Sequence, residues 1–107
     1  MVRTAAAVAA AFMLWAGTAT AAPPPHYSMW MCVHRQERTA WHDSGAPYWG
    51  GLQMGSWFLS AYPHPPGTPD RWTPMTQMWV AENAYRIEHY RRSWLAGQWP
   101  PSVGVCF

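Results

Sequence analysis

The chain has 107 residues, of which 11% are charged and 16% aromatic, and it carries a formal charge of +2 at pH 7 without a single lysine. With seven arginines against five acidic residues, it lacks the basic excess that is typical of a nucleic-acid-binding surface. We therefore expect no nucleic-acid partner, and the length suits one small domain.

The first 21 residues have the pattern of a secretory signal peptide. Arg3 provides a positive start, residues 5–15 form a short apolar stretch, and Ala19-Thr20-Ala21 is a small-residue cleavage site. No later stretch approaches the roughly 20 apolar residues that a membrane helix needs. We predict cleavage after Ala21 and a chain without a membrane span that is secreted or held in the cell envelope.

The first half of the remaining chain predicts two helices joined by a turn. Residues 22–27 contain three prolines and should form a flexible lead-in. Ser28 is the predicted N-cap of a first helix. Residues 43–51 predict a short strand pair or an irregular loop, because glycine and proline mark a turn there. The apolar spacing over residues 52–62 then predicts a second helix.

The second half predicts one long helix. Residues 63–69 are rich in proline and interrupt regular structure. Thr73-Pro74 is a strong helix start, with Thr as N-cap and Pro at the first helical position, and the helix should run to about Arg92. Its apolar residues lie on two sides, which is typical of a central and mostly covered helix. From Ser93 onward, glycines and prolines predict a wrapping segment that Cys106 ties down.

Cys32 and Cys106 are the two cysteines of the sequence. In an oxidising compartment we expect one disulfide, whose loop of about 74 residues would stabilise the fold by roughly 4 kcal/mol in the chain-entropy model. Two free buried thiols are the alternative. A domain this small buries only about 60 to 65% of its unfolded surface, so it needs such a link. We predict a mainly helical α+β domain over residues 28–107.

Glu37 has the most unusual position of the acidic residues. On a helix that starts near Ser28, Trp30, Val33 and Glu37 share one face. The carboxyl would therefore end an apolar stripe, where desolvation and the negative end of the helix dipole both raise its pKa. A carboxyl that stays protonated near neutral pH suits the general acid of a glycosidase. The alternative is a glutamate that is solvated or salt-bridged.

Two motifs connect this glutamate with a known family. MWMCVHRQE ends at Glu37, and YWGGLQM, residues 48–54, follows about a dozen residues later. The further matching residues are Trp41, Gln77, Ala81, Trp99, Pro100 and Cys106. Over most of the mature chain, this pattern resembles the lysozyme-like transglycosylase domains of bacterial cell-wall proteins, including the resuscitation-promoting factors. The resemblance implies a small lysozyme-like domain in which Glu37 is the single catalytic acid/base, acting on the bond between N-acetylmuramic acid and N-acetylglucosamine.

The resemblance also implies a glycan-binding cleft between the Glu37 helix and the next helix. The residues expected to contact substrate are Trp41, Tyr48, Trp49, Gly50, Gly51 and Gln53. The aromatic rings would lie flat on pyranose rings. The two glycines would let the backbone approach the sugar, and Gln53 would hydrogen-bond a hydroxyl or N-acetyl group. Alternatively, Trp49 is a core residue and the glycines only form a turn; Leu52 we assign to the core.

Two functions remain open. The first is a peptidoglycan-cleaving glycosidase, either a lytic transglycosylase or a muramidase, and the second is a non-catalytic cell-wall module that binds glycan in the same cleft. Asp43 is a candidate nucleophile or electrostatic partner, or it caps a turn. The five histidines show no pair at zinc-site spacing, so we expect neither metal nor cofactor. The expected partner is the peptidoglycan strand, and the expected state is a monomer.

Overall fold

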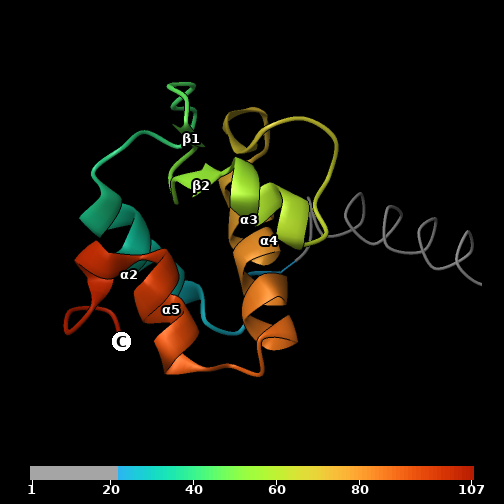
Figure 1. The fold of residues 1–107 in the computed structure, drawn as a ribbon. Helices are drawn as coiled ribbons and strands as arrows, with labels where there is room; N and C mark the ends of the chain where they lie inside the picture. Colours follow the sequence, from blue (N-terminus) through green and yellow to red (C-terminus); the bar gives the residue numbers. More distant parts are fainter. Residues whose placement is uncertain (1–21) are drawn as a thin grey trace, which may run out of the picture.

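The computed structural model describes residues 22–107, so the predicted signal peptide lies outside the described residues. In chain order, the elements are α2 (Tyr27–Glu37), β1 (Tyr48–Trp49), β2 (Met54–Gly55), α3 (Ser56–Ala61), η1 (Pro69–Arg71), α4 (Pro74–Ile87), α5 (Arg92–Gln98) and η2 (Pro100–Ser102). About half of the described residues are helical, which confirms the α+β class. Figure 1 shows α2 beside α5, with the hairpin of β1 and β2 at the top. Within this part of the chain, no helix combines the length and apolar character needed to cross a bilayer.

Helix α2 begins at Tyr27, so the prediction that Ser28 is its N-cap is wrong. His26 occupies the cap position, and no side chain there bonds to the helix. The helix starts earlier because the preceding segment, which we predicted as a flexible lead-in, packs against α4. The Trp79 indole donates to the Ala22 carbonyl at 2.9 Å, and the His26 backbone N–H donates to Glu82 Oε1 at 3.0 Å.

A strand pair is present, but only β1 lies within residues 43–51, where the pair was predicted. The second strand, β2, lies in the segment predicted as a helix over residues 52–62, so that predicted helix is too long. Met54 and Gly55 pair antiparallel with Trp49 and Tyr48. Gln53 has a φ of 53°, in the left-handed region that a continuous helix excludes. Helix α3 therefore begins only after the hairpin has closed, at Ser56.

Helix α4 starts where the sequence predicted. The Thr73 hydroxyl accepts from the backbone N–H of Thr76 at 3.1 Å, and most of the helix is buried, as expected of a central helix. It ends at Ile87 and not near Arg92, because His89 and Tyr90 have φ values of 58° and 57°. The predicted wrapping tail instead begins with a regular helix, α5.

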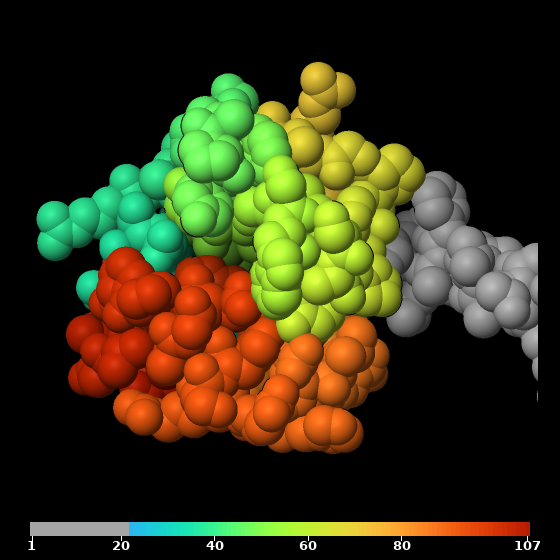
Figure 2. All heavy atoms as spheres, viewed as in Figure 1, coloured from blue at the N-terminus to red at the C-terminus, as the bar shows by residue number. Residues whose placement is uncertain are grey.

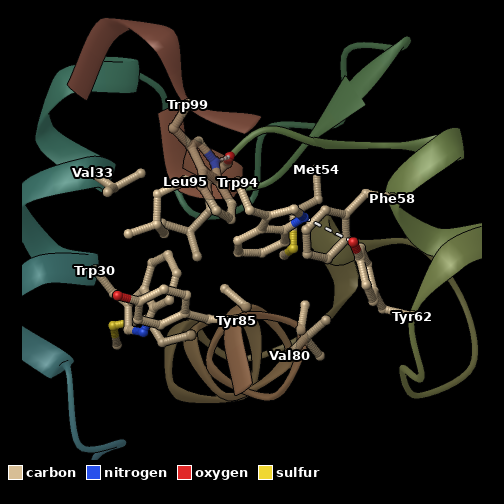
Figure 3. Close-up of a cluster of buried hydrophobic side chains, with 14 of the residues drawn as sticks. Trp30, Val33, Met54, Phe58, Tyr62, Val80, Tyr85, Trp94, Leu95 and Trp99 are labelled. Carbon is tan, nitrogen blue, oxygen red and sulfur yellow. Dashed lines mark hydrogen bonds between the residues drawn. The ribbon is translucent and has the colours of Figure 1, made fainter. Parts of the chain in front are cut away.

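The core contains a cluster of indole rings among aliphatic and other aromatic side chains (Figure 3). The Trp99 ring lies 5.2 Å from Trp30 and 5.6 Å from Trp94, and both pairs meet edge to face. Each buried N–H has an acceptor, because Trp99 donates to the carbonyl of Leu52 at 2.7 Å and Trp94 donates to the Tyr62 hydroxyl at 2.8 Å. The assignment of Leu52 to the core is confirmed, since it is fully buried.

A disulfide joins the two ends of the fold. Cys32 in α2 is bonded to Cys106, with a Cα–Cα distance of 5.6 Å, so the alternative of two free thiols is wrong. The C-terminal residues are thereby held against α2, in the region where η2 also packs on that helix. The disulfide therefore anchors the middle of α2 to the C-terminal segment.

Candidate functional site

Glu37 is the last residue of α2, and its carboxyl is partly withdrawn from solvent. Trp30 and Val33 are fully buried, so the apolar stripe that leads to Glu37 is present. Its Oε2 atom is buried and has no hydrogen-bond partner among the described residues. Desolvation raises the pKa of this carboxyl above its ordinary value. Neither of the two salt bridges among residues 22–107 involves Glu37.

Two side chains near the end of α2 tie this region to the hairpin turn. His34 Nδ1 donates to the Gly51 carbonyl at 2.9 Å, and the Thr39 hydroxyl donates to the Gly50 carbonyl at 3.1 Å. The Trp41 ring stacks on His34, with centroids 3.8 Å apart and planes inclined by 17°. The helix end that carries Glu37 is thus held to the glycine turn. Sequence reasoning missed His34, because no spacing rule connects it with Gly51.

Gln77, from the long helix, supports the same turn from inside the protein. It is fully buried. Its Oε1 atom accepts from the Gly51 N–H at 2.9 Å, and its Nε2 atom donates to the carbonyls of Trp41 and Trp72 at 2.8 and 3.1 Å. Every hydrogen bond of this side chain goes to a loop backbone. Gln77 therefore connects α4 to the loops on both sides of the hairpin.

Gly50 and Gly51 form a closely packed turn, which is the alternative that the sequence left open, and their approach to a sugar stays a prediction. A Cβ atom at Gly50 would collide with Gln77, and one at Gly51 would collide with the Trp41 ring. Gly50 also has a φ of 78°, which disfavours other residues. The Gly50 N–H donates to the Asp43 carbonyl, and both glycine carbonyls are occupied as described above. The missing side chains serve close packing within the protein.

Asp43 and Gln53 bond to each other. Gln53 Nε2 donates to Asp43 Oδ2 at 2.8 Å and to the Gly50 carbonyl at 2.9 Å. Asp43 Oδ1 accepts from the Gly45 N–H at 3.4 Å, which is the turn-capping arrangement. The amide hydrogens of Gln53 are thus committed to the turn. Its Oε1 atom is the part that can accept from a ligand.

A cavity of about 550 Å³ lies beside the hairpin. Its lining residues are Pro47, Tyr48, Gly55, Ser56, Trp57, Phe58, Gly97 and Gln98, from the hairpin, α3 and α5. Figure 2 shows a hollow between the green hairpin region and the red C-terminal region. Tyr48 is 54% exposed and Trp57 63% exposed, although both are large aromatic residues.

The structure divides the predicted binding residues into two groups. Tyr48 lines the cavity, as a binding role requires, whereas Trp41 and Trp49 are partly buried and lie outside its lining. Glu37 is not a lining residue either. Trp57 also lines the cavity but was not among the predicted binding residues, because its position in the predicted apolar helix suggested burial.

We also searched the described residues for a possible metal site. Residues 22–107 contain no group of three His, Cys, Asp or Glu side chains placed to hold a metal ion. In comparisons with known proteins, no protein-family model matches the chain. No curated protein and no solved structure matches it either. The function is accordingly argued from the site.

Proposed function

We propose that the protein is a secreted, lysozyme-like enzyme that cleaves the glycan strands of peptidoglycan, with Glu37 as its single acid/base. The observation that carries this proposal is the state of that carboxyl. One oxygen is buried without a partner, and desolvation raises the pKa. A general acid must still hold its proton near the operating pH, which an exposed, unperturbed glutamate does not.

The chemistry needs only one carboxyl that first gives and then takes a proton. Glu37 protonates the glycosidic oxygen between N-acetylmuramic acid and N-acetylglucosamine while the bond from that oxygen to the muramyl C1 breaks. The leaving sugar departs with a new hydroxyl. The Glu37 carboxylate then removes a proton from the muramyl C6 hydroxyl, which closes a 1,6-anhydro ring, or from a water molecule, which gives a reducing end. Asp43 supports the turn and takes no part.

The surroundings of Glu37 favour a fixed site. A catalytic carboxyl works best when neighbouring residues lock its position relative to the substrate. The bonds from His34 and Thr39 to the glycine turn join the end of α2 to the hairpin, and Gln77 fixes the same turn from α4. The hairpin in turn presents Tyr48 to the cavity. Glu37, the proposed acid, and Tyr48, the proposed glycan contact, therefore lie on segments that these hydrogen bonds hold together.

One observation favours the second candidate, a glycan-binding module without turnover. The cavity with its exposed Tyr48 and Trp57 is lined without Glu37. Such an aromatic surface would bind a sugar strand even if no bond were cleaved. The two candidates share the ligand and differ in whether Glu37 transfers a proton.

The deciding experiment is digestion of purified sacculi by the wild type and by Glu37→Gln, with mass spectrometry of the products. For the enzyme, we expect Glu37→Gln to lose turnover by about 10² to 10⁴-fold while still sedimenting with sacculi. Anhydro ends would identify a transglycosylase and reducing ends a muramidase. Glu88→Gln is the matched control, because Glu88 lies beyond the end of α4 and should not affect turnover. A wild type that binds sacculi without releasing fragments would overturn the enzyme in favour of the binding module.

A further inference from the structure

The cavity beside the hairpin is lined without Glu37, and it brings together the two most exposed aromatic side chains of the described residues, Trp57 and Tyr48. We propose that it is a stacking subsite for one uncharged N-acetylhexosamine ring of the glycan strand, with Trp57 and Tyr48 as its principal contacts. This inference rests on the proposed function, which supplies the glycan ligand. It adds which residues contact the sugar ring and that the cavity prefers an uncharged ring.

The two aromatic rings are exposed but held in place. Tyr48 pairs with Gly55 across the hairpin, and a Cβ atom at Gly55 would lie 2.9 Å from the Tyr48 ring, so the ring lies directly over the glycine. The Trp57 ring meets the buried Tyr62 ring edge to face, with centroids 6.2 Å apart. Rings that are fixed before binding lose little conformational entropy when a sugar stacks on them.

The remaining lining residues match a neutral sugar. None of the eight lining residues is charged. Ser56 and Gln98 provide a hydroxyl and an amide, which can bond to sugar hydroxyls or to an N-acetyl group. A carboxylate or an ammonium group on the ring would lose hydration here without gaining a partner of opposite charge. The volume of about 550 Å³ lies within the range of small-ligand sites.

Gly97 gives direct access to the α5 side of this cavity. A Cβ atom placed on it would meet no heavy atom within 4 Å. A larger side chain at this helical position therefore projects into open space without disturbing the core. Filling the cavity from Gly97 tests its occupancy independently of the aromatic residues.

The experiment measures binding of an N-acetylglucosamine trimer by calorimetry, in the wild-type exported chain and in Glu37→Gln. We expect Trp57→Ala to weaken binding about tenfold or more, with Trp57→Phe restoring part of the affinity. Tyr48→Ala should also weaken binding, whereas the matched control Tyr27→Ala should not, because Tyr27 is exposed but lies outside the cavity. Circular dichroism confirms that each variant is folded.

Two further series complete the test. Gly97→Leu should weaken binding more than Gly97→Ala, because it fills more of the cavity. The de-N-acetylated, cationic trimer should bind at least tenfold more weakly than the neutral one. Unchanged affinity in both Trp57→Ala and Gly97→Leu would overturn the subsite, and so would equal binding of the two trimers or no binding to the wild type at millimolar ligand. Each of these results can coexist with turnover that depends on Glu37, so failure of the subsite is distinguishable from failure of the enzyme.

Discussion

Two withdrawn carboxyls, Glu82 in α4 and Glu37 at the end of α2, differ in how they are paired. Glu82 is only 4% exposed, and it accepts from the Trp30 indole at 3.0 Å and from both the backbone and the ring of His26 at 3.0 and 2.8 Å. Glu37 is more exposed, yet its Oε2 atom has no partner among the described residues. Burial depth alone therefore does not distinguish the unpaired carboxyl from the paired one.

The difference in pairing separates a structural carboxyl from the one that we propose as the acid/base. The hydrogen bonds of Glu82 hold the segment before α2 and the Trp30 ring against α4, so its oxygens are already in use. Glu88 is another paired acid, because the Tyr62 hydroxyl at 2.6 Å and Arg91 at 2.6 Å bond to it and lower its pKa. For Glu37, desolvation acts in the opposite direction and raises the pKa.

The largest expected effect is a loss of activity, which should occur on substitution of Glu37 but not of Glu82. Glu37→Gln should reduce turnover on sacculi by about 10² to 10⁴-fold with little change in stability. Glu82→Gln should keep most of the turnover at a temperature where the variant is folded. Initial rates of fragment release, together with a melting curve for each variant, test this contrast. Equal losses of turnover in the two variants would mean that both act through the fold.

The next effect is on stability. Glu82→Ala removes the acceptor of the buried Trp30 N–H and of two donors from His26, so we expect the free energy of unfolding to fall by about 3 kcal/mol. Urea titration followed by tryptophan fluorescence measures the change. Asp70→Ala is a suitable comparison because it removes a partly exposed carboxyl outside the core. A loss in Glu82→Ala no larger than in this control would show that pairing at Glu82 contributes nothing.

Tyr62 is expected to show a smaller effect of the same kind. Desolvation and the bond to Glu88 raise its pKa to about 12. Tyr62→Phe leaves the buried Trp94 N–H without an acceptor, which should cost about 1 to 3 kcal/mol in denaturant unfolding. Tyr48→Phe, at an exposed position, should change the free energy of unfolding by less than about 0.5 kcal/mol. If the two variants had the same free energy of unfolding, the hydrogen bond between Tyr62 and Trp94 would contribute no net stability.

The smallest expected effect concerns how stability depends on pH, and it should differ in sign between Glu37 and Glu88. Because the pKa of Glu37 is higher in the folded state, wild-type stability from this group is complete below pH 4.5 and is lost as pH rises through the folded pKa. Glu37→Gln should gain relative stability over that range. For Glu88 the folded pKa is lowered, so its contribution is present above pH 4.5 and is lost as pH falls. Melting temperatures from pH 3 to pH 8 should therefore diverge in opposite senses for Glu37→Gln and Glu88→Gln.

The sequence predicted features that depend on short spacing. Thr73 and Pro74 determine the start of α4 locally, and the face shared by Trp30, Val33 and Glu37 follows from helical geometry alone. The disulfide followed from the count of two cysteines. These predictions were confirmed because each needs only neighbouring residues or a single possible pairing.

Features that depend on distant contacts were predicted poorly. The packing of the glycines of YWGGLQM was not predicted, because their neighbours are Trp41 and Gln77, which is 26 residues from Gly51. The start of α2 shifted because Glu82 holds His26, and the left-handed residues at Gln53 and His89 ended helical patterns that the apolar spacing favoured. The exposure of Trp57 was likewise not predicted. Sequence periodicity does not contain this information, because tertiary packing decides it.

The most direct test of the central claim is the ionisation of Glu37 itself. Carbon-detected NMR of the side-chain carboxyls, recorded over pH 2 to pH 8, gives a separate midpoint for each glutamate, and the Glu37→Gln spectrum assigns the relevant signal. We predict a Glu37 midpoint above the ordinary value of 4.5 and well above that of Glu88. A Glu37 midpoint at or below 4.5 would show a carboxyl that is already ionised at working pH, and the acid/base role would be contradicted.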